Sequence, residues 1–292
     1  MSGTDRWRFR CWRYFQGAGL LGVGILVITH LSPVAAESPT PAQKLITLPQ
    51  VLVIAHRGNS SVAPENSLPA FQAAIEAKSD LVELDYHHAA DGVPVVLHDE
   101  ILDRTTDSER LFGKTKLVVG DFAAAELCKL DVGTWFDARF AGVRLPTLLE
   151  SLKVIQTGST TLIERKGGDP KTLVKLLEQE GLMDTVVVQA FDWDFVAECR
   201  KLAPRLALGT LSGKAASDEQ IRAAAATGAD LIVWNHEKIG REQIELIHSL
   251  GKKAWAYTID DPQRARYLVS QGLDGVITNK PAAMASLRNA RQ

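Results

Sequence analysis

The sequence predicts an α/β fold, a TIM-type (βα)8 barrel. Short apolar runs of about five residues alternate with helical stretches, as expected for a parallel sheet buried on both faces. Eight such runs fit a closed barrel better than a doubly wound sheet, and no G-x-G-x-x-G motif follows the first run. We expect strands at 51–55, 81–85, 161–164, 186–190, 206–210, 231–234, 254–258 and 275–278.

The first 36 residues have the pattern of a secretory signal peptide. An arginine-rich segment precedes residues 17–29, which are uncharged and mostly apolar, and small residues follow at Val34, Ala35 and Ala36. The apolar stretch is shorter than the roughly 20 residues of a membrane span, and a retained anchor is the alternative. We therefore expect an exported protein, periplasmic or extracellular, with no stable membrane span after cleavage.

The remaining sequence is expected to form a linker at residues 37–50 and a barrel domain at 51–292, of about the usual barrel length. The whole chain has a formal charge of −2, and residues 1–36 carry four arginines and one aspartate. Subtracting their +3 leaves −5 on the mature chain. Because no basic excess is available to neutralise a phosphate backbone, we expect no nucleic-acid partner. Cys128 and Cys199 remain after cleavage, either as a disulfide or as two buried thiols.

Helix patterns lie between most of the predicted strands, and several carry clear start or end signals. Ser67 is a suitable N-cap, and Gly181 and Gly251 are suitable C-terminal stops. Proline favours the first turn of a helix at Pro262. We expect helices at 68–77, 171–180, 194–202, 218–226, 241–250 and 262–270, with a final helix from Pro281.

One stretch interrupts the alternation of strands and helices. The second strand is followed by Asp91-Gly92 and then by an apolar run at 94–97, which is too close for a crossover helix. We expect a hairpin with a tight turn at Asp91-Gly92, in the register that places His98 opposite Asp85. Residues 101–145 then form a small insertion, with a core of its own or a position over the barrel mouth.

Acidic side chains gather where the predicted strands end, which is where barrels place their active sites. Glu83 and Asp85 are two residues apart on one strand and therefore point to the same face. With Glu164 they form an oxygen-ligand set suited to magnesium or calcium, because a divalent cation relieves the repulsion between carboxylates. The alternative is a structural ring of salt bridges with Arg57 and Lys166.

Two histidines also lie at strand ends and are candidates for general acid and base. They are His56, after the first strand, and His98, after the hairpin. Arg57 and Lys166 can neutralise a phosphate. Metal ligands, cations and paired histidines together favour phosphoryl transfer over glycoside hydrolysis, which needs neither metal nor cations.

Several short motifs carry a resemblance to a known family. They are AHRG at 55–58, PENS at 64–67, ELDYH at 83–87, DGVPVVLHD at 91–99, LDRTT at 102–106, LPTL at 145–148, ERK at 164–166 and DGVIT at 274–278. They span nearly all of the mature chain, and the N-terminal motifs are the most specific. The sequence resembles the glycerophosphodiester phosphodiesterase family of the phospholipase C-like phosphodiesterase superfamily.

This resemblance implies hydrolysis of a small-molecule glycerophosphodiester, such as glycerophosphocholine, to sn-glycerol 3-phosphate and an alcohol. It also implies one divalent cation, magnesium or calcium. In the family, a glycerol hydroxyl of the substrate attacks phosphorus, and water then opens the cyclic phosphate. The implied residues are His56 and His98 for acid/base catalysis, Glu83, Asp85 and Glu164 for the metal, and Arg57, Glu65, Lys166, Gln189 and Trp255 for substrate.

Three positions depart from the family pattern, namely Arg165, Tyr257 and Asn279. Arg165 is expected to point away from the lumen, whereas the other two affect details of the substrate pocket. His87 is expected to support the ligands. Two other functions stay open, a phospholipase D-like lipid phosphodiesterase and a catalytically inactive barrel that binds glycerol phosphates. The inactive barrel would be expected to lack a site residue, and all of them are present. The sequence predicts neither head group nor oligomeric state.

Overall fold

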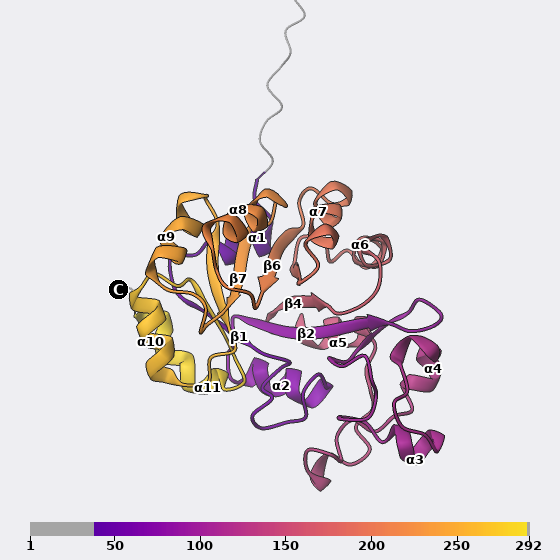
Figure 1. The fold of residues 1–292 in the computed structure, drawn as a ribbon. Coiled ribbons are helices and arrows are strands. Elements are labelled where there is room, and N and C mark those ends of the chain that lie inside the picture. The colour runs from indigo at the N-terminus through magenta and orange to yellow at the C-terminus, as the bar shows by residue number, and fades with distance from the viewer. Residues whose placement is uncertain (1–37, 291–292) are drawn as a thin grey trace, which may run out of the picture. The chain divides into compact units, whose positions relative to one another are not determined.

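Eight parallel strands close into a barrel, because the first of them pairs with both the second and the last. The computed structural model describes residues 38–290, and the TIM-type architecture predicted from the sequence is confirmed (Figure 1). Each predicted strand is present to within a few residues. The barrel strands are β1 (Leu52–Ala55), β2 (Leu81–His88), β4 (Thr160–Arg165), β5 (Val186–Ala190), β6 (Ala207–Ser212), β7 (Leu231–Asn235), β8 (Lys253–Tyr257) and β9 (Gly275–Thr278).

The helices form an outer layer around the strands. Ser67 caps α2 as predicted, since its hydroxyl accepts a hydrogen bond from the Ala70 N–H. The sequence analysis missed α5, although Thr147 and Glu150 form a capping box at its start. The helices are α2 (Leu68–Glu76), α5 (Leu148–Ile155), α6 (Pro170–Gln179), α7 (Trp193–Leu202), α8 (Asp218–Ala226), α9 (Arg241–Ser249), α10 (Pro262–Ser270) and α11 (Pro281–Met284), the last followed by a 3₁₀ turn at Ala285–Asn289.

The barrel lumen is divided into an apolar floor and a polar mouth. Side chains alternate along each strand, so Leu52 and Ile54 of β1 belong to the lumen cluster, whereas Val53 packs with the helix layer. Leu81 and Leu162 occupy the same apolar cluster at the start of their strands. Residues further along the same inward-facing rows are polar, and these polar positions form the site described below.

A short helix closes the amino-terminal end of the barrel. This helix, α1 (Pro41–Ile46), begins with Thr40 and Gln43 in a capping box. Ala42 and Ile46 are buried in the lumen cluster together with the first residues of the strands. The prediction of a linker over 37–50 is therefore wrong for α1. Its prolines suggested a linker, but proline is also favoured in the first turn of a helix.

The predicted hairpin is present, but its register differs by one residue. β3 (Pro94–Val96) pairs antiparallel with the end of β2. The turn contains three residues rather than two, because the Ala89 N–H donates to the Val93 carbonyl and Gly92 adopts a left-handed conformation with φ 78°. Leu97, not His98, consequently lies opposite Asp85, to whose carbonyl its N–H donates at 3.1 Å.

The insertion has an apolar core that it shares with the hairpin. Val95 and Leu97 of the hairpin pack with Leu102, Leu127 and Leu130 of the insertion. The insertion contains α3 (Ser108–Phe112), α4 (Ala124–Leu127) and two 3₁₀ turns, Val119–Asp121 and Ala138–Phe140. In Figure 1 the labels α3 and α4 lie to one side of the barrel, beyond the end of β2. The shared core therefore ties the insertion to the strand that carries Glu83 and Asp85.

Other predictions concern the N-terminus and the cysteines. The predicted signal peptide lies outside the described residues and stays a prediction. No helix within residues 38–290 is long and apolar enough to cross a membrane. Cys199 is buried, Cys128 is half-buried, and both are free thiols.

The role of α1 in closing the barrel can be tested through stability. We expect Ile46→Ala to lower the free energy of unfolding by about 2–4 kcal/mol, because it leaves a cavity in the lumen cluster. Urea denaturation measures the change. Leu48→Ala, at an exposed position just after the helix, is the control and should change stability by less than about 0.5 kcal/mol. Equal stability of Ile46→Ala and the wild type would contradict the packing role of α1.

Candidate active site

Three carboxylates meet at the polar mouth of the barrel. Glu83 and Asp85 extend from β2 and Glu164 from the adjacent β4, and the strand register places Asp85 directly beside Glu164. All three side chains are buried. Each offers one oxygen within 4.8 Å of the other two. The structure thus brings together the three residues that the sequence analysis assigned to a metal.

Two basic side chains reduce the repulsion within this carboxylate trio. The Lys166 ammonium lies 3.3 Å from Asp85 Oδ1 and pairs with Glu164, and the Arg57 Nε lies 3.2 Å from Asp85 Oδ2. The Arg57 backbone N–H also donates to Glu83 Oε2 at 2.6 Å. The salt bridges that the sequence analysis raised as an alternative to a metal are therefore present around the trio.

The surroundings of the three carboxylates shift their pKa values in different directions. Burial, together with the charges of Asp85 and Glu164, raises the pKa of Glu83 well above its usual value. Burial and Asp85 likewise raise the pKa of Glu164 to about 7, against the effect of Lys166. Burial acts to raise the pKa of Asp85 too, but Lys166 and Arg57 outweigh it and hold that pKa below its usual value. Only Asp85 is therefore stably charged by the protein alone.

The residues present fit a divalent cation. Among the described residues, Glu83 Oε1 is buried without a hydrogen-bond partner, although it faces two other carboxylates. A buried carboxylate oxygen is rarely left unpaired in a native protein. A cation would satisfy this oxygen and favour the charged forms of Glu83 and Glu164.

The loop after β1 is shaped to deliver Arg57 to the carboxylates. Arg57 has φ 55° and Gly58 φ 81°, and a Cβ on Gly58 would lie 2.7 Å from Ala70 of α2. Asn66, at φ 56°, fixes the far end of the loop, because its amide donates to Asp85 Oδ2 at 2.8 Å and its carbonyl oxygen accepts from the Asp85 N–H. The loop and β2 are thereby held in one arrangement.

His56 is oriented by a chain of polar side chains. The Asn279 amide nitrogen donates to Asp260 Oδ2 at 2.7 Å, so its oxygen faces His56 Nδ1 at 2.8 Å. Nδ1 therefore carries the proton, and Nε2 is left as an acceptor. Burial, followed by the charge of Arg57, lowers the pKa of His56 to about 4. The ring is thus neutral near pH 7, which is the form a general base requires.

His98 has a different partner, a carboxylate. Its Nδ1 lies 2.6 Å from Asp99 Oδ1, and Arg104 bridges Asp99 and Glu65. Burial lowers the pKa of His98, while the charge of Asp85 and the bond to Asp99 act in the opposite direction. His87 Nε2 lies 3.1 Å from the His98 carbonyl, and the expected support of the ligands by His87 stays a prediction.

Glu65 links the two sides of the site. It accepts hydrogen bonds from Arg57 at 2.7 Å and from Arg104 at 2.8 Å. Burial acts to raise its pKa, but the two guanidinium groups lower it overall. Glu65 therefore joins Arg57 to Arg104 at the mouth of the barrel, and its predicted role in binding substrate stays a prediction.

Two aromatic side chains line the mouth of the barrel near Lys166. Phe191 and Tyr257 are in edge-to-face contact with ring centroids 5.9 Å apart, and the Lys166 ammonium lies 5.5 Å from the Phe191 ring. Gln189 precedes Phe191 by two residues, and its side-chain amide donates to Glu164 at 3.4 Å. Trp255 is fully buried in the apolar floor, and its predicted contact with substrate stays a prediction. Tyr257, one inward-facing position further along β8, occupies the mouth.

Arg165 behaves as the alternation predicts. It points to the helix layer, where it pairs with Asp192 at 2.9 Å and lies over the Phe195 ring. Asn66, Asp99 and Arg104 lie within the family motifs, but the sequence alone indicated no role for them. Asp260 was missed entirely, since only the folded chain brings it to Asn279.

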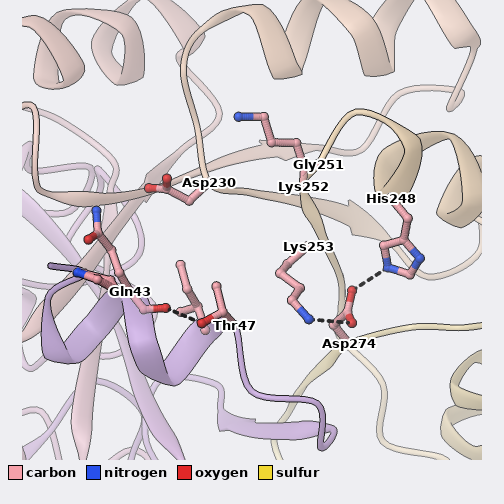
Figure 2. A pocket seen from close by; sticks show the side chains of 10 residues that line it. Gln43, Thr47, Asp230, His248, Gly251, Lys252, Lys253 and Asp274 are labelled. Atoms are coloured by element: carbon pink, nitrogen blue, oxygen red, sulfur yellow. Dashed lines mark hydrogen bonds and ion pairs between the residues drawn. The ribbon is translucent and has the colours of Figure 1, made fainter. Parts of the chain in front are cut away.

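A cavity of about 520 Å³ lies at the opposite end of the barrel from the carboxylate trio (Figure 2). Its lining residues Asp230, Lys253 and Asp274 come before or at the start of strands, whereas the carboxylate trio lies near strand ends. Asp274 accepts from His248 Nε2 at 2.7 Å and from the Ala254 N–H at 2.8 Å. These bonds connect neighbouring elements of the fold. We therefore assign the polar residues of this cavity a structural role and place the active site at the carboxylate trio.

Comparison with known proteins decides the family. The model of the "Glycerophosphoryl diester phosphodiesterase family" matches residues 56–283, which includes every residue of the carboxylate trio and both histidines. The chain belongs to this family. It is thus an enzyme of phosphodiester hydrolysis, as the resemblance of its motifs implied, and the family generally uses a divalent metal.

Individual relatives agree with this membership. The chain is 33% identical over 245 residues to a glycerophosphodiester phosphodiesterase of Caldanaerobacter subterraneus, covering 82% of this chain and 98% of the relative. Among solved structures, a phosphodiesterase of Oleispira antarctica in complex with the product sn-glycerol-3-phosphate is 30% identical, with a TM-score of 0.74 over 82% of this chain and 97% of that one. A Silicibacter pomeroyi structure described as a putative glycerophosphoryl diester phosphodiesterase is 27% identical, with a TM-score of 0.74 over 84% and 95% of the two chains.

Proposed function

We propose that this enzyme hydrolyses glycerophosphodiesters such as glycerophosphocholine to sn-glycerol 3-phosphate and an alcohol, with one magnesium or calcium ion. The observation that carries the proposal is the buried carboxylate trio together with two histidines whose Nδ1 atoms are held by Asn279 and Asp99. The product bound in the Oleispira relative supports the assignment of the phosphate-bearing product.

Glu83, Asp85 and Glu164 would hold the cation. When bound, such an ion stabilises negative charge that develops on the phosphoryl oxygens. Arg57 and Lys166 lie on either side of Asp85 and would bind the remaining phosphate oxygens. Together these residues would fix the phosphorus between the two histidines and exclude bulk water from its charged oxygens.

The two histidines would divide the proton transfers. His56, neutral and with Nε2 as an acceptor, would take the proton from the attacking glycerol hydroxyl of the substrate. His98 would donate a proton to the departing alkoxide, because its bond to Asp99 opposes the lowering of its pKa by burial. In the second step the roles reverse, and water opens the cyclic phosphate with His98 as base and His56 as acid.

Metal dependence tests the proposal directly. The mature chain should release glycerol 3-phosphate from glycerophosphocholine, and chelation should reduce the rate by about 10²-fold or more because the carboxylate trio then lacks its cation. Added magnesium or calcium should restore the rate. A coupled assay for glycerol 3-phosphate measures both. Full activity after thorough chelation would contradict the metal site, and absence of turnover with any glycerophosphodiester would contradict the function.

Substitution of the histidines tests their roles. His56→Ala and His98→Ala should each lower kcat by about 10²-fold or more, since each removes one proton transfer.

Asn279→Ala should lower kcat by about tenfold, because His56 loses the partner that fixes its tautomer. Ser61→Ala, in the same loop as His56 but exposed, is the control. Steady-state kinetics on variants of unchanged melting temperature measure this, and a wild-type kcat in either histidine variant would exclude its role.

A further inference from the structure

A small cavity lies beside the site, between the segments that follow β5 and β6. Its volume is about 220 Å³, which is below the roughly 300–1,000 Å³ of pockets for drug-sized ligands. Phe191 and Trp193 form one wall, and Ser212, Lys214 and Gln220 form the other. The cavity is therefore of a size for one small alcohol.

The cavity is continuous with the phosphate-binding residues through shared side chains. Phe191 lines the cavity, and its ring lies 5.5 Å from the Lys166 ammonium. Tyr257, which contacts Phe191, also reaches the other wall, where a Cβ on Gly213 would lie 3.3 Å from its hydroxyl. A group attached to phosphorus near Lys166 can thus extend along Phe191 into this cavity.

We propose that this cavity binds the leaving alcohol of the substrate and that it prefers an uncharged or anionic polyol to a quaternary ammonium group. This inference rests on the proposed function. In that reaction the glycerol hydroxyl attacks phosphorus and must remain at the histidines, whereas the other alcohol departs. A cavity at the rim suits the departing group, since Phe191 is 48% exposed and Lys214 is exposed as well.

The charge of the cavity argues against a cationic occupant. Lys214 is the charged residue among those that line it, and among the described residues its ammonium has no hydrogen bond or ion pair. Aromatic faces alone would favour a quaternary ammonium. Here, however, the Phe191 ring already faces the Lys166 ammonium and so offers less attraction to a second cation, and Lys214 would repel a cationic head group in the cavity.

The uncharged groups of the cavity suit hydroxyl-bearing ligands. The Ser212 hydroxyl accepts a bond from the Lys214 N–H at 3.2 Å, which leaves its own proton free to donate. The Gln220 amide can both donate and accept. The Trp193 indole N–H is already used by the Leu211 carbonyl at 2.9 Å, so Trp193 offers an apolar face to the carbon skeleton of a polyol.

Competition between two substrates tests the preference. The purified enzyme with its cation is assayed with glycerophosphoinositol and with glycerophosphocholine, and the ratio of their kcat/KM values is measured. We expect the wild type to favour glycerophosphoinositol by about fivefold, which corresponds to about 1 kcal/mol for an exposed charge interaction. Lys214→Glu should lower this ratio by about fivefold or more, and high salt should weaken both effects.

Lys44→Glu is the matched control, because it makes the same charge reversal on α1 at the other end of the barrel. It should leave the ratio unchanged. A ratio that is the same in the wild type and Lys214→Glu, or that shifts equally in Lys44→Glu, overturns the inference while the hydrolase function stands. Absence of turnover with both substrates in every variant would instead reject the proposed function on which the inference rests.

Discussion

The repulsion among three buried carboxylates is the constraint on which the site depends. Glu83, Asp85 and Glu164 lie within 4.8 Å of one another at the mouth of the barrel, where water cannot screen them. Arg57 and Lys166 stabilise the charge of Asp85 but leave the pKa values of the other two carboxylates raised. Without a cation the protein therefore favours the protonated form of Glu83, and a divalent cation would favour its charged form. The loop after β1, in which Arg57 has a positive φ, places the Arg57 guanidinium beside Asp85.

The barrel makes this arrangement possible by separating packing from chemistry along the same strands. Inward-facing residues at the start of each strand form an apolar floor that α1 closes, and those at the end form the polar mouth. The end of β2 also pairs with β3, and Val95 of β3 packs in the core of the insertion. The segment that leads to His98 and Asp99 is thus attached to the same strand as Glu83 and Asp85. The insertion that follows contributes Arg104, which bonds Asp99 and Glu65.

The sequence predicted the barrel, the carboxylate trio and both histidines because strand alternation and strand ends are local properties. It failed where geometry depends on contacts between distant residues. Trp255 and Tyr257 share a face, and only the depth of the floor shows that Tyr257 reaches the mouth. The three-residue turn at Gly92 moved the hairpin register by one position, and the pairing of Asn279 with Asp260 requires the folded barrel. The prolines before α1 fit both a linker and a helix start, and burial of Ile46 decides between them.

Thermal unfolding with and without cation tests the central claim most directly. In chelator, Glu83→Gln should melt at the wild-type temperature, because the raised pKa of Glu83 makes its protonated form, which glutamine mimics, the stable one. Magnesium or calcium at about 100 times its dissociation constant should raise the wild-type Tm by roughly 5–10 °C and leave Glu83→Gln unchanged. An equal rise in both proteins, or no rise in the wild type, would show that the carboxylate trio is not a cation site.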